Sequence, residues 1–109
     1  MGLGWCCFRN YAAHAEEIGG DISEEYPRFF LKPASAHVEA DENGNNVIEL
    51  MNEEDHIDHE AELVVRLGDD LRPEAMCIGC DTTNRTRQTI AKNKRWPWTE
   101  GKAFRGSGV

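Results

Sequence analysis

The sequence is short of positive charge and has no long apolar run. Twenty acidic residues stand against twelve lysines and arginines, which leaves a formal net charge of −8. Lysine and arginine are what chiefly hold nucleic acids and anionic membranes, so this balance argues against either as a partner. No stretch approaches the length of a transmembrane helix, and the N-terminus lacks a signal peptide's basic region and apolar core. We therefore expect a cytoplasmic protein whose four cysteines are thiols.

Internal repeats, low-complexity tracts and linkers are also absent from the 109 residues. That length fits one domain with one modest core, and 39% hydrophobic residues is a thin supply for it. Apolar or alternating runs, separated by turn residues, outnumber the segments with helical composition. The sequence therefore predicts a single α+β domain over residues 1–109, mostly β, with short helices between the strands.

Local patterns place the expected elements. The apolar and alternating runs predict strands over residues 3–8, 28–32, 47–50, 60–67 and 76–80. Helices are expected over residues 84–94 and 10–18, the latter with Asn10 as a candidate N-cap and a Gly-Gly pair as its stop signal. A polar, turn-rich loop is expected over residues 41–46, and Pro73 could begin a brief helix.

Glu60 and Glu62 lie in a run, residues 59–67, whose positions alternate as in a β-strand. Alternate side chains of a strand point to the same face, so the two glutamates project together and the apolar residues project from the other face. Carboxylates roughly 7 Å apart would repel by about 2 kcal/mol at an effective dielectric near 20. Solvent would screen this on an exposed strand, whereas a partly buried strand would need a cation to offset it.

Asp81 directly follows the apolar run 76–80 and could bring a third carboxylate to the end of that strand. Carboxylate oxygens suit Mg²⁺, Mn²⁺ or Ca²⁺, and three of them would leave positions for substrate and water. The alternative is that Glu60 and Glu62 are solvent-facing strand residues and that Asp81 belongs to a turn.

His14 and Glu17 form a second candidate pair. Three positions apart on the expected helix, they would share a face, where a carboxylate raises the basicity of an imidazole and holds its tautomer. Such a pair can take a proton from water or from a carbon acid. The alternative is a surface histidine on a short acidic helix.

Lys32 and Lys102 each follow a stretch rich in bulky apolar or aromatic residues. Either lysine could bind a substrate carboxylate, although lysines at strand ends usually extend to solvent. Trp96 and Trp98 are expected to anchor the core. Residues 92–95 form a basic patch, which we interpret as the solvated end of a helix.

Cys77 and Cys80 offer a competing interpretation. With His56 and His59 they could form a zinc-binding module, or the two cysteines could be a redox pair. Structural zinc needs its cysteines in tight turns and a redox pair needs a helix start, whereas these lie in an apolar, strand-like run. Two small buried hydrophobic side chains are the third interpretation.

Five segments, in order, together resemble the C-terminal catalytic domain of the fumarylacetoacetate hydrolase family. They are RNYAAHAEE at 9–17, FLKP at 30–33, HEAEL at 59–63, DTTNRTRQ at 81–88 and PWTEGKAF at 97–104. The resemblance spans nearly the whole chain. It implies the family's fold, a mixed β-roll with short helices, of which this chain would hold the part that carries the metal site.

The resemblance also implies a role for each candidate residue. Glu60, Glu62 and Asp81 would bind Mg²⁺ or Mn²⁺, Lys102 would act beside them, His14 and Glu17 would be the acid/base pair on a lid, and Lys32, Arg85 and Gln88 would bind substrate. The substrates would be fumarylacetoacetate- or acylpyruvate-like 2-oxo acids. Hydrolysis, isomerisation and decarboxylation beside a carbonyl all leave an enolate, which the metal would stabilise.

The family's domain continues beyond the residues matched here. The resemblance therefore implies an open sheet edge and an uncovered apolar face in this chain. We expect a homo-oligomer, such as a dimer, or another chain to complete the β-roll. A catalytically inactive member that serves as a structural or interaction piece is the alternative function.

Overall fold

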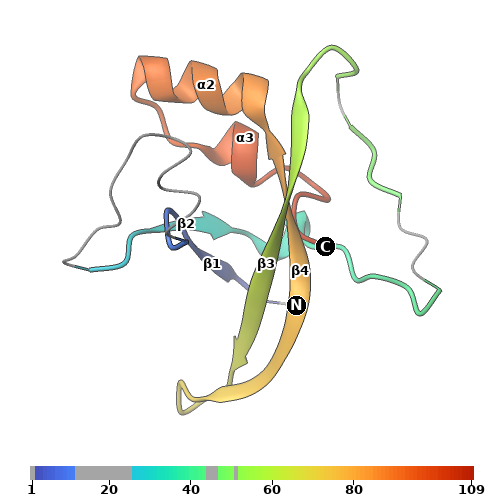
Figure 1. Cartoon of the computed structure of the whole chain (residues 1–109), viewed down its shortest axis with the longest axis vertical. Coiled ribbons are helices and arrows are strands. Elements are labelled where there is room, and N and C mark those ends of the chain that lie inside the picture. Colours follow the sequence, from blue (N-terminus) through green and yellow to red (C-terminus); the bar gives the residue numbers. More distant parts are fainter. Residues whose placement is uncertain (1, 12–25, 44–46, 51) are drawn as a thin grey trace.

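The computed structural model describes residues 2–11, 26–43, 47–50 and 52–109. This part of the chain is α+β with strands predominant, as the sequence predicts (Figure 1). Its elements are β1 (Gly4–Cys7), β2 (Phe29–Lys32), the 3-10 helix η1 (Ala34–Ala36), β3 (Ile57–Leu67), β4 (Pro73–Asn84), α2 (Arg85–Lys94) and α3 (Thr99–Lys102).

Two antiparallel strand pairs form the framework. β1 pairs with β2, with Gly4 opposite Lys32, and β3 pairs with β4 in a long hairpin, with Ile57 opposite Asn84. The α2 and α3 helices lie at the end of the hairpin where β4 finishes (Figure 1). Because α3 contacts both β2 and β4, it links the two strand pairs.

β4 passes directly into α2 at a capping residue. The Asn84 side chain accepts a hydrogen bond from the backbone N–H of Arg87 at 2.9 Å, which satisfies a free donor of the first turn. The helix ends at Lys94, and the left-handed backbone of its C-cap Arg95 (φ 59°) lets the Arg95 N–H reach the carbonyls of the last turn. Residues 92–95 are exposed, as the sequence predicts. In the described residues, no helix combines the length and the apolar character that a membrane crossing requires.

The segment after α3, residues 103–109, returns to lie beside β4. The Thr82 N–H donates to the Ser107 carbonyl at 2.8 Å, and Val109 exchanges two backbone hydrogen bonds with Cys80 at 2.7 and 3.1 Å. The glycine between Ser107 and Val109 also donates its N–H to the Ala36 carbonyl in η1 at 3.1 Å. The segment therefore joins η1 to the hairpin.

The buried centre of the described residues is mostly polar. Its buried hydrophobic side chains are the small Ala36 and Ala91. The buried polar and charged residues are Lys32, Asp81, Thr82, Thr83, Gln88, Lys102 and Ser107. Burying charged groups is costly unless they are paired and hydrogen-bonded, so the contacts among these residues indicate where a functional site lies.

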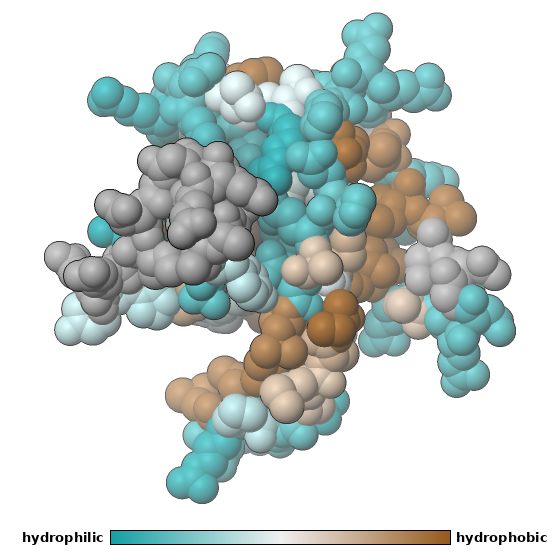
Figure 2. All heavy atoms as spheres, in the orientation of Figure 1, coloured by the Kyte–Doolittle hydropathy of each residue, from teal (hydrophilic) through white to brown (hydrophobic). Residues whose placement is uncertain are grey.

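The apolar face of the hairpin is uncovered in the described residues. Leu63 on β3 and Ile78 on β4 are opposite each other and are 58% and 76% exposed. Val65 and Met76, the next pair on the same face, are also exposed. Figure 2 shows hydrophobic side chains gathered along the lower part of the hairpin. The expectation of an uncovered apolar face is confirmed.

Two expected elements are wrong. Residues 47–50 are not a strand, because their backbone pairs with no strand of the described residues. Pro73 does not begin a helix but is the first residue of β4, paired with Leu67. Proline lacks a backbone N–H and is tolerated at the first position of a strand, so the hairpin register prevails over the local helix signal.

Two further expectations concern helix 10–18 and the tryptophans. Residues 12–18 of the expected helix lie outside the described residues. Trp98 packs against Phe8 and Phe30, with ring centroids 5.3 and 6.2 Å apart, as a core anchor would. Trp96 is 53% exposed, so its expected burial is wrong; the Lys94 ammonium lies over its ring at 4.6 Å instead.

Candidate metal centre

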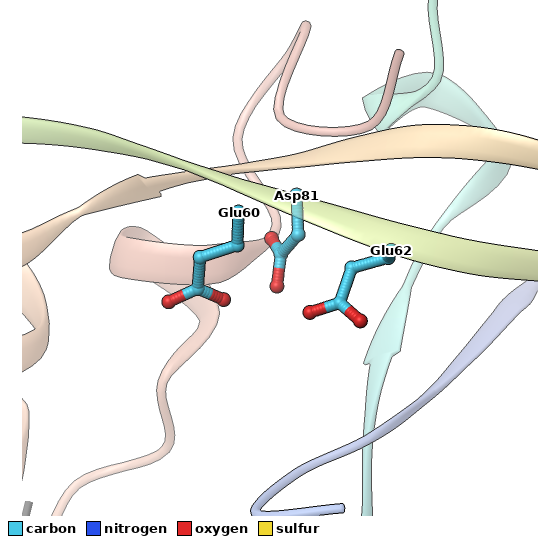
Figure 3. Close-up of side chains that lie close together, drawn as sticks. All are labelled: Glu60, Glu62 and Asp81. Carbon is cyan, nitrogen blue, oxygen red and sulfur yellow. The ribbon is translucent and has the colours of Figure 1, made fainter. Parts of the chain in front are cut away.

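Three carboxylates converge on one face of the hairpin. The register places Asp81 of β4 directly opposite Glu60 of β3, and Glu62 lies two residues along the same face. One oxygen from each lies within 4.8 Å of the others (Figure 3). The sequence predicted that Asp81 would lie at the end of a strand. It lies within β4 instead. Cross-strand pairing therefore brings together the three residues that the sequence predicted as metal ligands.

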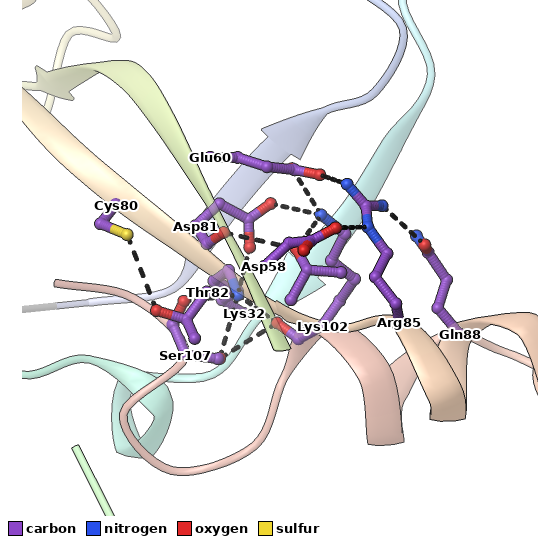
Figure 4. A network of polar contacts seen from close by, with 11 residues as sticks. Lys32, Asp58, Glu60, Cys80, Asp81, Thr82, Arg85, Gln88, Lys102 and Ser107 are labelled. Atoms are coloured by element: carbon purple, nitrogen blue, oxygen red, sulfur yellow. Dashed lines mark hydrogen bonds and ion pairs between the residues drawn. The ribbon is translucent and has the colours of Figure 1, made fainter. Parts of the chain in front are cut away.

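The Lys102 ammonium joins two of these carboxylates. Its Nζ lies 2.7 Å from Glu60 Oε2 and 2.8 Å from Asp81 Oδ2, and it donates to Thr83 Oγ1 at 2.6 Å (Figure 4). Lys102 is only 4% exposed, since it ends α3 directly beneath the hairpin. Charge-assisted bonds of this length are strong and fix geometry, so Lys102 holds Glu60 and Asp81 at a set separation.

Lys32 binds the other oxygen of Asp81. Its Nζ lies 2.9 Å from Asp81 Oδ1 and donates to the carbonyl and hydroxyl oxygens of Ser107 at 3.0 Å each, and also to the Lys102 carbonyl. Burial lowers the pKa of Lys32, and the neighbouring Asp81 carboxylate opposes that effect. The side chain is buried, unlike the usual strand-end lysine.

Arg85 extends the network at the start of α2. Its guanidinium donates to Glu60 Oε1 at 2.6 Å, Asp58 Oδ2 at 2.7 Å and Gln88 Oε1 at 2.9 Å. Arg85 and Gln88 share a face of α2 because they are three positions apart. The helix therefore presents Arg85 beside Glu60, with Gln88 next to Arg85 (Figure 4).

The glutamates of the cluster have opposite electrostatic environments. Burial raises the pKa of Glu60, but the Lys102 ammonium and the Arg85 guanidinium outweigh it, so the pKa is lowered overall. Burial also raises the pKa of Glu62, and the Glu60 and Asp81 charges add to that effect, with a hydrogen bond from Tyr11 opposing it. In the described part of the chain, Glu62 has no ion pair with a lysine or arginine.

This donor set fits a divalent cation. Three carboxylate oxygens converge, and Glu62 lacks the cation that its neighbours have. Oxygen ligands in this number suit Mg²⁺ or Mn²⁺, which also retain positions for water or substrate oxygens. Glu60, Glu62 and Asp81 could therefore hold such an ion together.

Aromatic and glycine packing set the floor of the site. The Phe30 ring lies below the ammonium groups of Lys102 and Lys32, with centroid distances of 5.3 and 6.0 Å. Gly101 lets α3 approach α2, because a Cβ there would lie 2.9 Å from the Gln88 nitrogen. Replacing either feature would move Lys102 relative to the carboxylates.

His14 and Glu17, the predicted acid/base pair, lie outside the described residues. The zinc hypothesis is wrong for the described residues, where the carboxylates are the group that could hold a metal. Cys77 and Cys80 are three positions apart in β4 and therefore point to opposite faces, which also precludes a redox pair. Cys77 is exposed, so the expectation of a buried hydrophobic side chain fails there as well.

Three residues of the network were not singled out by the sequence. Thr83 binds Lys102, Ser107 binds Lys32, and Asp58 binds Arg85. Asp58 is two residues before Glu60 and hence on the same strand face, so the alternation rule could have found it. No local pattern marks Ser107, whose role arises from the return of the C-terminal segment.

Comparison with known proteins supports the predicted relationship. Residues 4–109 match the family model described as Fumarylacetoacetate (FAA) hydrolase C-terminal. The mitochondrial oxaloacetate decarboxylase of Dictyostelium discoideum is 39% identical over 106 residues, covering 88% of this chain and 47% of that protein. The mitochondrial oxaloacetate tautomerase FAHD1 of Arabidopsis thaliana is 38% identical over 107 residues, covering 89% and 46%.

A solved structure supports the fold. The fumarylpyruvate hydrolase of Pseudomonas aeruginosa, solved in complex with Mn²⁺ and pyruvate, superposes with a TM-score of 0.81 at 32% identity, covering 95% of this chain and 49% of that one. The chain spans about half the length of the curated relatives it matches. Because the family model covers residues 4–109 and the fold agrees, the chain belongs to the fumarylacetoacetate hydrolase family.

Proposed function

We propose that this chain carries the metal-binding part of a Mg²⁺- or Mn²⁺-dependent enzyme that hydrolyses, isomerises or decarboxylates 2-oxo acids. The observation that carries the proposal is the convergence of Glu60, Glu62 and Asp81 within 4.8 Å on a half-buried strand face. The relatives named above act on oxaloacetate by their names, and the solved neighbour holds Mn²⁺ and pyruvate. Both molecules are 2-oxo acids.

The charges of the site support an anionic substrate. The three carboxylates and Asp58 face three cations, Lys32, Lys102 and Arg85, so the network carries one net negative charge. Addition of a divalent ion would make it positive by one charge. A 2-oxo acid, which places a carboxylate next to a carbonyl oxygen, would offset that charge and could bind through both oxygens.

The chain's own residues would share the work of catalysis. A bound divalent ion would act as a Lewis acid for the negative charge that develops on the substrate's 2-oxo oxygen. Lys102 keeps Glu60 and Asp81 in place, and its ammonium would add positive charge beside the ion that they hold. Arg85, which contacts Glu60, and Gln88 next to it would bind the substrate carboxylate and oxo groups.

His14 and Glu17 complete the proposed machinery. His14, oriented by Glu17, would activate water for hydrolytic cleavage or move a proton for isomerisation, as a general acid/base does. A lid carrying this pair would close over the substrate and exclude bulk water. Decarboxylation would need only the stabilised negative charge and protonation of the resulting carbon.

The uncovered hairpin favours a second candidate function. Leu63 and Ile78 are exposed on an apolar face, which argues that the chain works within a homo-oligomer or together with another chain. A catalytically silent chain that serves as an interaction or structural piece would show the same face. Activity of the purified chain distinguishes the two functions.

The test is turnover by the full 109-residue chain. Oxaloacetate and a set of acylpyruvates would be incubated with Mg²⁺, with Mn²⁺ and with chelator, using Glu60→Ala as the loss-of-ligand variant. The matched control is Glu74→Ala, which removes an exposed glutamate at the start of β4, in the opposite half of the strand from Asp81. Metal-dependent turnover that is lost only in Glu60→Ala supports the enzyme. Lack of turnover across the set, in folded protein, supports the silent chain.

A further inference from the structure

We propose that Lys32 is a positioning residue that holds Asp81 and the 102–107 segment in place, and that it does not contact the substrate. This inference rests on the proposed function, because Asp81 matters here as a metal ligand. The family resemblance by itself implies a different role, with Lys32 in the lining of the substrate pocket. The contacts of the Lys32 ammonium decide between the two.

Every proton of that ammonium is already engaged. A lysine ammonium has three N–H donors and no acceptor. Four oxygens lie around the Lys32 nitrogen: Asp81 Oδ1 at 2.9 Å, the Ser107 carbonyl and hydroxyl oxygens at 3.0 Å each, and the Lys102 carbonyl. The residue is 2% exposed. No free donor and almost no accessible surface are left for a substrate oxygen.

Lys32 restrains Asp81 from the side opposite Lys102. Lys102 Nζ donates a hydrogen bond to Oδ2 at 2.8 Å, and Lys32 Nζ forms an ion pair with Oδ1 at 2.9 Å, so each carboxylate oxygen has a cation beside it. A carboxylate with a cation at each oxygen cannot rotate about its Cβ–Cγ bond without breaking one charge-assisted contact. The oxygen that faces Glu60 and Glu62 is thereby kept in one orientation before any ion arrives.

Lys32 also fixes the backbone that positions Lys102. Its ammonium donates to the Lys102 carbonyl, and the Ser107 hydroxyl donates to the same carbonyl at 3.1 Å. Ser107 is fully buried and its carbonyl accepts from Thr82 of β4 at 2.8 Å. One buried ammonium therefore links β2, the end of α3 and β4, the elements that carry Lys32, Lys102 and Asp81.

Mn²⁺ affinity gives a readout that separates positioning from substrate contact. The probe is Mn²⁺ alone, titrated into the full chain by calorimetry and by electron paramagnetic resonance of the free ion. Loss of a group that orients a metal ligand typically weakens binding 10- to 100-fold, so Lys32→Met should raise the Mn²⁺ Kd by about that factor. Simple removal of a positive charge near the site would instead lower the Kd, since a repulsion is lost.

The matched control is Lys94→Met, which removes a lysine from the exposed end of α2. Its Kd should stay within about twofold of the wild type. At saturating Mn²⁺, the KM of Lys32→Met for oxaloacetate should also stay within about threefold, because a positioning residue acts on the metal rather than the substrate. An unchanged Mn²⁺ Kd together with a raised KM would overturn the inference in favour of direct substrate binding.

A second variant covers the case in which Lys32→Met does not fold. Ser107→Ala deletes one of the four acceptors and keeps the ammonium, and should weaken Mn²⁺ binding by a few-fold with the far-ultraviolet circular dichroism unchanged. An unaltered Kd in folded Ser107→Ala would count against the linkage. Wild-type chain that takes up no Mn²⁺ would refute the proposed function itself, a result distinct from unchanged variants of a chain that does bind.

Discussion

Glu60 and Asp81 are directly opposite each other across the β3–β4 hairpin, and the Lys102 ammonium binds one oxygen of each at 2.7 and 2.8 Å. The ammonium offsets one of their two negative charges and holds the pair together. Glu62, on the same face, has no cation bound to it in the described residues. The site therefore combines two restrained ligands with one whose charge a bound ion would relieve.

Glu62→Gln should separate metal binding from stability. Neutral glutamine removes the repulsion from Glu60 and Asp81, so the ion-free protein should unfold at a slightly higher urea concentration than the wild type. Mn²⁺ binding should weaken by at least about 100-fold, because loss of a ligand costs more than loss of a group that only orients one. Glu74→Gln is the control for both measurements. A variant that is less stable and still binds Mn²⁺ normally would contradict the assignment of Glu62.

Lys102→Met should destabilise the ion-free protein strongly. Glu60 and Asp81 would be left close together with one cation fewer, and breaking a buried ion pair from one side costs about 3 kcal/mol. Urea unfolding monitored by circular dichroism gives the free energy of unfolding. Lys94→Met should lie within about 0.5 kcal/mol of the wild type. Equal losses in the two variants would mean that the Lys102 ammonium does not stabilise the carboxylate cluster.

Gly101→Ala should displace α3. The added Cβ would lie 2.9 Å from the Gln88 nitrogen and 3.1 Å from the Asn84 carbonyl oxygen, and backbone atoms cannot move aside as a flexible side chain can. Overpacking of this kind costs about 1–3 kcal/mol of stability and would shift Lys102. Gly2→Ala, where no atom lies within 4 Å of the added Cβ, is the control. A normal melting temperature for Gly101→Ala would show that α3 has room to move.

Asp55 should make stability depend on acid pH. A hydrogen bond from Asn84, with further contributions from Arg87, lowers the pKa of Asp55 below its ordinary value of 3.8. A carboxyl group with a lowered folded-state pKa stabilises the protein above the unfolded pKa, and that contribution is lost as pH falls through the folded value. Asp55→Asn should therefore be less stable than the wild type at pH 7, with the difference narrowing at pH 3. A difference independent of pH in urea unfolding would contradict this.

The apolar face of the hairpin should drive association. Leu63 and Ile78 face each other across the strands and are largely exposed, and contiguous apolar surface of this kind marks an interaction site. The double variant Leu63→Lys, Ile78→Glu should sediment as a monomer, more slowly than the associated wild type. The two new charges can pair across the strands, so the hairpin itself should be preserved. A monodisperse wild-type monomer that unfolds cooperatively would refute the expectation.

Local patterns were enough to predict several features. The alternation around Glu60 and Glu62 identified both the strand and the shared face of the two carboxylates, because side-chain direction in a strand depends only on residue parity. The helical composition of residues 84–94 predicted α2, which begins at Arg85 with Asn84 as its N-cap. The helix expected at Pro73 was wrong because pairing with β3 made this residue part of a strand. The strand expected at 47–50 was wrong because no described strand pairs with it.

The sequence by itself therefore determined the residue types of the site and the face on which two of them lie. Only the tertiary structure placed Asp81 opposite Glu60, because hairpin register depends on the whole length of two strands and on a bulge near Arg66. It also buried Lys32 and Lys102, which local chemistry would leave in solvent. Their ammonium groups are stable there only because carboxylates and carbonyls from distant segments replace the water that they lose.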